Sequence, residues 1–363
     1  MSSPDIGWWT KVLAGPGGDL RSTSSDEQYM VLPSLSDPRV VVDRDADQAV
    51  KDSVDRIVAA RTKNSTARSL AGAASTLLWR RKAGWIVNAA ASHETLREHL
   101  ANVLDTDLRI SISVGPPRPN RKPVVRCYRD SGLFAVAKLG PDPHTAAMVE
   151  NEVRWLDVMA GSPLSGVVTP PLLHSGAYGG SALLIMGALD LENDLGVEFS
   201  EVPLDIAQEF AVRHAEQLPL IESEWWHELP LRMDNGLLDS VKAQLHQAPD
   251  VRAFDSIETA AWHGDWSPWN MGRSTNGKLC IWDWERARFG VPTGFDILHL
   301  HFQYGDGIDG ADGDLLTLGV PESSLSFLKR LYFFELCARH CEADALETDQ
   351  HRRVLDGLDV LTP

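Results

Sequence analysis

Two short segments near residue 270 hold side chains suited to phosphoryl transfer. The first contains Asp265, and Asn270 follows five residues later. The second contains Asp283, 18 residues after Asp265. Phosphoryl transfer from ATP needs a carboxylate that orients and deprotonates the acceptor hydroxyl, and oxygen ligands that hold magnesium on the phosphates. A tight loop and an adjacent strand would aim these three side chains into one cleft.

The order and spacing of these residues resemble those of a known family. The two segments read WHGDWSPWN and IWDWE. They are similar to the His-Gly-Asp-x-x-x-x-Asn and Asp-x-Glu motifs of the aminoglycoside phosphotransferase and choline kinase branch of the protein-kinase-like superfamily. The resemblance implies that Asp265 is the catalytic base and that Asn270 and Asp283 bind magnesium. It also implies ATP and Mg²⁺ as cofactors.

The same resemblance suggests roles for three polar residues near these motifs. Glu285 either binds a second magnesium or forms an ion pair with Arg286 or Arg288. We expect His263 to support the loop by hydrogen bonding rather than to act as an acid or base. Asp296 resembles a family position that ties its segment to the catalytic loop, so its role would be structural.

The family also implies a lysine and a glutamate that together position the nucleotide. Lys138 ends an apolar strand, and Glu152 lies on the predicted helix that follows. Glu150 is the competing partner, and we favour Glu152 because it shares a face with apolar side chains. A Lys–Glu pair holds the ammonium on the α- and β-phosphates. The strand that ends at Met186 and Ala188 would be the hinge that meets adenine through backbone groups.

Hydrophobic spacing predicts the elements that must position these residues. Apolar residues alternate with polar ones or form short runs at 108–114, 124–129 and 133–139, which indicates an antiparallel meander. A helix at 144–160 and a strand at 181–186 follow. The pattern beyond residue 187 is mainly helical, with amphipathic candidates at 205–217 and 237–247 and a long closing helix at 324–344.

The first hundred residues predict an added module. We expect strands at 29–32 and 39–42, and helices at 47–60, 67–81 and 92–104, the last with Ser92 as its N-cap. The chain would then divide into a structural cap (1–105), a nucleotide-binding lobe (106–188) and a helical catalytic and substrate-binding lobe (189–363). These elements predict an α+β fold class, and the family resemblance implies a bilobal protein-kinase-like fold, with an antiparallel-sheet N-lobe, a mostly helical C-lobe and the added cap.

The loop between the first two strands of the meander differs from that of protein kinases. It is rich in proline and lacks the Gly-x-Gly-x-x-Gly signature, so it offers fewer backbone donors to phosphate. Arg118, Arg121 or Lys122 would supply charge there, or they form a solvated basic turn. The sequence holds no Walker loop, which excludes a P-loop kinase.

Tryptophans flank both motif segments. Alternation along the second segment predicts that Trp282 and Trp284 pack on the side opposite Asp283. Trp266 and Trp269, inside the catalytic loop, are the better candidates for contact with a substrate. Cys337, His340 and Cys341 at helical spacing are expected to be core residues.

Composition and charge restrict the partners. The net charge of −17 argues against a broad affinity for nucleic acid, because a polyanion is bound by Lys and Arg. No apolar run of signal-peptide or membrane-spanning character is present. The spacing of the four cysteines is typical of a reducing cytoplasm rather than of a disulfide framework.

The sequence therefore predicts an enzyme that phosphorylates a small hydroxyl compound. A sugar, amino sugar, aminoglycoside or amino alcohol would fit, and the acidic surface permits a cationic substrate. The alternative is a pseudokinase, a nucleotide-binding scaffold that regulates a partner. Protein kinase activity is disfavoured because Gly264 stands where protein kinases usually carry Arg.

Overall fold

The computed structural model divides the chain into two compact units. One unit contains Met1–Val153 and Pro170–Ala188, and the other contains Arg154–Thr169 and Leu189–Pro363. The structure describes residues 12–13, 19–21, 28–33, 38–45, 49–53, 86–90, 94–114, 120–130, 132–192, 196–213, 218–235, 238–246, 257–305 and 307–361. The expected helix at 67–81 lies outside these residues, and of the expected helix at 47–60 only 49–53 are described, all helical.

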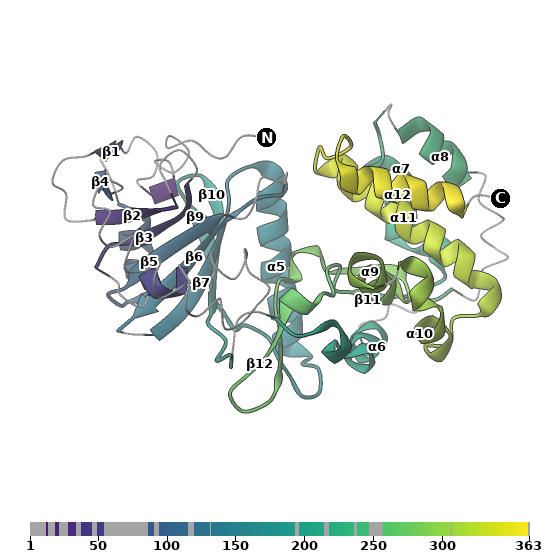
Figure 1. The fold of residues 1–363 in the computed structure, drawn as a ribbon, viewed down its shortest axis with the longest axis horizontal. Helices are drawn as coiled ribbons and strands as arrows, with labels where there is room; N and C mark the ends of the chain where they lie inside the picture. The colour runs from purple at the N-terminus through teal and green to yellow at the C-terminus, as the bar shows by residue number, and fades with distance from the viewer. Residues whose placement is uncertain are drawn as a thin grey trace. The chain divides into compact units, whose positions relative to one another are not determined.

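The first unit is built on one sheet of nine described strands, each paired antiparallel with its neighbours (Figure 1). Its strand order is β1-β4-β2-β3-β5-β6-β7-β10-β9. The bounds in chain order are β1 Asp19–Arg21, β2 Gln28–Pro33, β3 Pro38–Asp43, β4 Ile86–Ala90, β5 Arg109–Val114, β6 Pro123–Arg129, β7 Gly132–Gly140, β9 Leu172–Tyr178 and β10 Ser181–Gly187. The predicted meander is thus confirmed as β5, β6 and β7.

The N-terminal strands continue the sheet of the meander. β3 pairs with β5, and the buried carboxylate of Asp43 accepts the backbone N–H of Ile110 over 2.6 Å. The hydroxyls of Ser53 and Ser111 lie 2.6 Å apart in the same region. Along β2 and β3 apolar side chains enter clusters on both faces of the sheet, so these strands are buried on both sides. Residues from the expected cap therefore form part of the same sheet as the expected nucleotide-binding lobe.

Helices α4 and α5 stand next to strands of this sheet in the sequence. α4 (Leu96–Leu104) begins at a capping box, in which the Thr95 side chain accepts the N–H of Glu98 and the Glu98 carboxylate accepts that of Thr95. The N-cap is therefore Thr95 and not Ser92, which lies outside the described residues. α4 buries Leu96 and Leu100 in the apolar cluster beneath β5, β6 and β7. α5 (Pro143–Gly161) confirms the helix predicted at 144–160.

In its described residues, the second unit is mainly helical with two small sheets. β11 pairs with β14, and β13 pairs with β12 and with β8. The strands are β8 Val167–Val168, β11 Thr259–Trp262, β12 Met271–Arg273, β13 Leu279–Ile281 and β14 Arg288–Pro292. The helices are α6 Leu204–Arg213, α7 Glu224–Arg232, α8 Asp239–His246, α9 Phe295–Tyr304, α10 Asp312–Thr317, α11 Leu325–Glu342 and α12 Asp349–Val360.

Helix α11 is the centre of the second unit's core. It is buried along nearly its whole length and packs against α7, α9 and α12 (Figure 1). This confirms the closing helix predicted at 324–344, and its buried residues include charged side chains such as Glu335 and Arg339 as well as apolar ones. Within the described ranges, no helix combines the length and apolar character that crossing a membrane requires.

Candidate active site

The expected catalytic loop follows β11 and folds back on the backbone carbonyl of Asp265. Ser267 Oγ donates to that carbonyl oxygen over 3.1 Å, and Asn270 Nδ2 donates to it over 3.0 Å. The short 3₁₀ turn Pro268–Asn270 completes the loop. Asn270 is buried, whereas the side chain of Asp265 is 25% exposed. The amide of Asn270 is therefore tied to the residue expected to act as base.

Asp296 holds the start of this loop from helix α9. Its two carboxylate oxygens accept the backbone N–H groups of His263 and Gly264, over 2.7 and 3.0 Å. Burial raises the pKa of Asp296 to about 7, and the two N–H donors oppose that rise. The prediction that Asp296 ties its segment to the catalytic loop is confirmed by these two contacts.

His263 braces the loop against the second motif segment. Its Nε2 lies 3.1 Å from the carbonyl oxygen of Trp282, and its Nδ1 accepts the backbone N–H of Asp265 over 3.3 Å. Burial lowers the pKa of His263 to about 4, so the ring is neutral at physiological pH. These contacts agree with the expectation that His263 supports the loop by hydrogen bonding.

Gly264 lets the two segments approach closely. Its φ is +84°, and a Cβ at this position would lie 2.5 Å from the backbone oxygen of Arg286. Only glycine adopts this conformation without a steric cost and also leaves the required space. The loop that carries Asp265 is thus in direct backbone contact with the turn that follows Asp283.

The second segment places Asp283 and Glu285 on a turn after β13. Asp283 has left-handed backbone angles (φ 70°, ψ 51°), which are uncommon for residues other than glycine and cluster at functional sites. Carboxylate oxygens of Asp283 and Glu285 lie within 4.8 Å of each other. The N–H of Trp282 donates to the backbone oxygen of Asn270 over 3.1 Å, so the two segments are neighbours. Arg288, one of the partners considered for Glu285, pairs with Glu228.

Sequence reasoning missed His299, which contacts the predicted base. His299 Nε2 lies 3.1 Å from Asp265 Oδ1, and its Nδ1 lies 2.9 Å from the hydroxyl of Tyr332 on α11. Burial is the largest effect and opposes ionisation of Asp265, but the hydrogen bond from His299 and the electrostatic effects of His299 and His263 together outweigh it and lower the pKa of Asp265 to about 2. The available signal was the spacing of Asp296 and His299, three residues apart on one apolar helix.

In the first unit, Lys138 and Glu152 form the pair that the sequence predicted. Lys138 Nζ lies 2.8 and 2.6 Å from the two carboxylate oxygens of Glu152, and both side chains are buried. Glu150, the competing partner, is exposed. A buried charge is retained only when it is paired, so this contact fixes the ends of both side chains.

The expected hinge is the end of β10. Met186 is paired with Val136 on β7 and with Leu172 on β9. The N–H of Ala188 donates to the carbonyl oxygen of Phe134 over 3.1 Å. The backbone of this segment is therefore fixed by the neighbouring strands.

The proline-rich loop is described only from residue 120 onward. Arg118 lies outside the described residues. Lys122 is buried, and its Nζ lies 3.9 Å from the sulfur of Met148. Lys122 therefore does not belong to a solvated turn.

The tryptophans of the two segments differ in exposure. Trp266 is fully buried with its ring edge-on to His263, so the prediction that it contacts a substrate is wrong. Trp269 is 51% exposed and lies edge-on to Tyr304, with ring centroids 4.2 Å apart. Trp284 is fully buried against Phe210.

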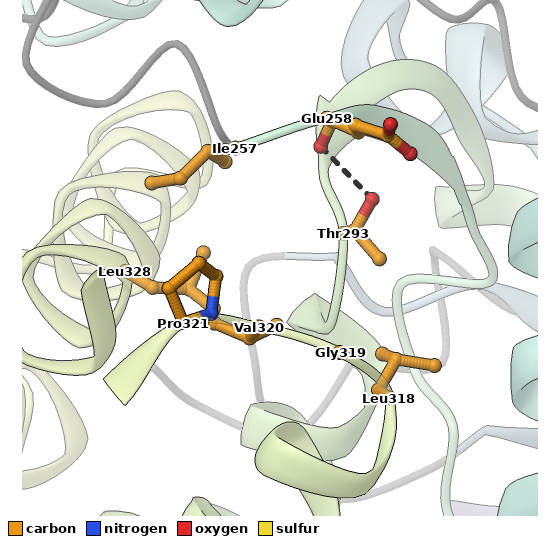
Figure 2. A pocket seen from close by; sticks show the side chains of 8 residues that line it. All are labelled: Ile257, Glu258, Thr293, Leu318, Gly319, Val320, Pro321 and Leu328. Carbon is orange, nitrogen blue, oxygen red and sulfur yellow. Dashed lines mark hydrogen bonds between the residues drawn. The ribbon is translucent and has the colours of Figure 1, made fainter. Parts of the chain in front are cut away.

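A small cavity elsewhere in the second unit is separate from these residues. Figure 2 shows its lining, which comes from the loop after α10, from helix α11 and from the segments around β11 and β14. Its volume is about 190 Å³. Thr293 Oγ1 donates to the carbonyl oxygen of Glu258 at its edge, over 2.9 Å. None of the predicted site residues lines it.

Comparison of the sequence with protein-family models and with curated proteins gave no match. Solved structures match in fold. A thermostable mutant of the aminoglycoside phosphotransferase APH(4)-Ia, in apo form, has a TM-score of 0.51 and 12% identity, and the match covers 74% of this chain and 98% of that one. A variant of the same enzyme in ternary complex with AMP-PNP and hygromycin B gives a TM-score of 0.51 at 11% identity, covering 74% and 97%.

A second kind of enzyme gives a match of the same quality. LicA, the choline kinase of Streptococcus pneumoniae, in complex with AMP has a TM-score of 0.50 and 14% identity. That match covers 73% of this chain and 97% of that one. At these identities the similarity establishes fold. The chain has the α+β, protein-kinase-like fold of the aminoglycoside phosphotransferases and choline kinase.

Proposed function

We propose that this chain is an ATP-dependent phosphotransferase that moves the γ-phosphate to a hydroxyl of a small polar molecule. The arrangement around Asp265 carries the proposal. Its carboxylate is partly exposed, whereas its backbone carbonyl accepts hydrogen bonds from Ser267 and Asn270. The segment with Asp283 is hydrogen-bonded to Asn270 through the backbone of Trp282. A base and oxygen ligands held in neighbouring segments are what phosphoryl transfer requires.

The donor atoms near Asp265 fit magnesium. Asn270 uses its Nδ2 on the carbonyl of Asp265, so Oδ1 is the amide atom that a cation would take. Carboxylates of Asp283 and Glu285 lie within 4.8 Å of each other. Magnesium prefers carboxylate and amide oxygens, and when bound it would neutralise charge on the phosphates. In this proposal Asn270 and Asp283 hold the ion, with Glu285 as a further ligand.

Other residues of the chain would bind and orient the reactants. The pKa of Asp265, lowered to about 2, keeps the carboxylate ionised and able to accept the proton of the acceptor hydroxyl. Lys138, held by Glu152, would contact the α- and β-phosphates. The backbone around Met186 and Ala188 would meet adenine through carbonyl oxygens, because the N–H of Ala188 is bonded to Phe134. Complexes of the similar structures with AMP and AMP-PNP support nucleotide binding.

A sugar, amino sugar, aminoglycoside or amino alcohol is the proposed acceptor. The similar structures include one with hygromycin B and an enzyme named for choline, which supports a small polar acceptor without selecting one. Cys127, Cys280 and Cys337 are free and buried, which supports a reducing compartment such as the cytoplasm.

Turnover with a panel of these acceptors tests the proposal. Purified protein is incubated with Mg²⁺ and ATP, and ADP and phosphorylated product are measured for each acceptor. Asp265→Asn is the matched control, because it keeps the shape and removes the base. It should lower turnover by about 10²–10⁴-fold. Nucleotide binding without product from any acceptor would contradict the proposal and favour a pseudokinase scaffold.

A further inference from the structure

The side chain of His299 links the candidate base to the core of the second unit. It is 8% exposed on helix α9. One ring nitrogen contacts Asp265 Oδ1 over 3.1 Å, and the other contacts the Tyr332 hydroxyl over 2.9 Å. Tyr332 is fully buried in α11, so this chain of hydrogen bonds begins in the close-packed core of the unit.

The chemistry of the three groups fixes the direction of both hydrogen bonds. An ionised carboxylate only accepts, so His299 Nε2 must carry the ring hydrogen. Burial lowers the pKa of His299, and the hydrogen bond to Asp265 and the charge of Asp265 oppose this effect. The charges of Arg339 and Arg286 add to the lowering, and the net shift is downward, so the ring is neutral and Nδ1 has no hydrogen. Nδ1 then accepts from the hydroxyl of Tyr332. Tyr332 thereby selects the tautomer that donates to Asp265.

A single donor on Oδ1 leaves the carboxylate with a defined orientation. Asp265 can rotate about two side-chain bonds, and its side chain is 25% exposed. Because Oδ1 is held by His299, Oδ2 is the oxygen left to accept the proton of an acceptor hydroxyl. Misplacement of a reacting group by about 1 Å can cost about 10² in rate, so such a restraint has catalytic value.

We propose that His299 is a positioning residue for the phosphotransfer proposed above: it holds Oδ1 of Asp265, so that Oδ2 is presented to the acceptor hydroxyl. This inference rests on the proposed function. In the reaction the acceptor oxygen forms a bond to the γ-phosphorus, and the bond from that phosphorus to the β-bridging oxygen breaks. ADP leaves with the electron pair, and the hydroxyl proton passes to Oδ2 of Asp265.

His299→Gln and His299→Asn differ in how far their amide nitrogen extends, so together they distinguish a positioning role of His299 from a packing role. The amide nitrogen of glutamine can lie where Nε2 of histidine lies, whereas asparagine reaches only as far as Nδ1. We expect His299→Ala and His299→Asn to lower kcat by about 10–100-fold with the KM values for ATP and acceptor little changed. His299→Gln should restore kcat to within about 5-fold of the wild type. Tyr332→Phe removes the hydroxyl that selects the tautomer of His299 but keeps the imidazole ring. It should therefore lower kcat by less than His299→Ala does.

Two further measurements complete the test. Ring ¹⁵N chemical shifts of His299 in the wild-type protein should show hydrogen on Nε2 and none on Nδ1. Melting temperatures of the Asn and Gln variants should be similar, because both lose the ring. His99→Ala, on α4 and bonded to Glu94, is the control that should keep kcat.

The outcomes distinguish this inference from the function on which it rests. A wild type that phosphorylates no acceptor would refute the proposed function. An active wild type with an equally active His299→Ala variant would refute the role of His299 alone. Equal kcat for the Gln and Asn variants, or hydrogen on Nδ1 of His299, would also overturn it.

Discussion

Arg339 on α11 donates a hydrogen bond from Nη1 to the backbone oxygen of Gly264, over 2.7 Å. Its Nε donates to Glu335 over 2.9 Å, and its guanidinium lies 4.2 Å from the ring centroid of Trp262. Glu335 also accepts from Arg232 on α7. A buried charge network therefore connects the core helices to the backbone residue that precedes the candidate base.

Replacement of Arg339 should lower both the free energy of unfolding and the rate of the proposed phosphotransfer. Arg339→Ala leaves the buried Glu335 with one cationic partner fewer and removes the donor to Gly264. Breaking a buried ion pair costs about 3–5 kcal/mol, and denaturant unfolding measures the loss. Arg352→Ala, an exposed arginine paired with Asp349, is the control and should change stability by less than about 0.5 kcal/mol. Equal stability of the two variants would show that the network is unimportant.

The Lys138–Glu152 pair permits a test that separates folding from nucleotide binding. Glu152→Gln should lower stability by about 3–5 kcal/mol, because it leaves a buried ammonium without its counter-charge. The double variant Lys138→Met with Glu152→Leu should regain most of that stability, because apolar groups of similar size replace the pair. Turnover should stay low in both. Unfolding curves and the KM for ATP report the two effects separately.

The exposed Glu150 is the matched control for this pair. Glu150→Gln removes the same charge at an exposed position of α5, two residues before Glu152. It should leave stability and the KM for ATP unchanged. A double variant with full activity would contradict a role of Lys138 at the phosphates.

Trp269 is expected to contact the acceptor. Its side chain is 51% exposed in the loop between Asp265 and Asn270, and aromatic contacts contribute about 0.5–1.5 kcal/mol beyond buried area. Trp269→Ala should therefore raise the KM for the acceptor by about 10-fold and leave the KM for ATP unchanged. Leu231→Ala, another exposed apolar side chain, should change neither. Equal increases in both KM values would argue against a specific acceptor contact.

Buried histidines should make the protein less stable in mild acid. His340 and His351 lie with their Nδ1 atoms 3.0 Å apart, and burial lowers the pKa of His340 to about 4. The unfolded chain has a histidine pKa of about 6.5, so between pH 6.5 and 4 the unfolded state binds a proton that the folded state does not. The free energy of unfolding then falls as pH falls through this window, by up to about 1.4 kcal/mol per pH unit for each such group.

His340→Gln removes one of these groups and should flatten the pH dependence of stability between pH 6 and 5. Asp296 acts in the opposite direction, because its raised pKa stabilises the folded state at low pH and that contribution is lost as pH rises to about 7. The difference between wild type and variant cancels the contribution of Asp296. Urea unfolding at several pH values measures how the free energy of unfolding changes with pH in the wild type and in His340→Gln. Identical slopes for the two proteins would contradict the prediction.

Local sequence signals predicted the elements with strong periodicity. β5, β6, β7, β10, α5 and α11 lie within a few residues of the predicted ranges. β9 was missed because it is an edge strand with mostly half-exposed or exposed residues and no alternation of apolar and polar residues. The pairing of β3 with β5 was also missed, because hydrophobic spacing shows which residues form a strand but not which strand lies beside it.

The candidate site also contains residues that the sequence predicted and residues that it did not. Asp265, Asn270 and Asp283 stand in two short motifs, so their proximity followed from sequence order. The contacts of His299 and Arg339 join residues 34 and 75 positions apart, across helices that pack only in the folded unit. Trp266 was misjudged because position in a loop did not indicate that its side chain turns into the core.

The glycine at position 264 has a further consequence for how this sequence can change. Its α-carbon faces the carbonyl of Arg286 with no room for a methyl group. Adoption of the arginine that protein kinases carry there would require the main chain at 286 to retreat, together with the acidic turn attached to it. Replacing Gly264 by arginine does not by itself move the main chain at 286. A steric barrier at this one position therefore separates the His-Gly-Asp motif of this chain from the arginine-containing motif of protein kinases.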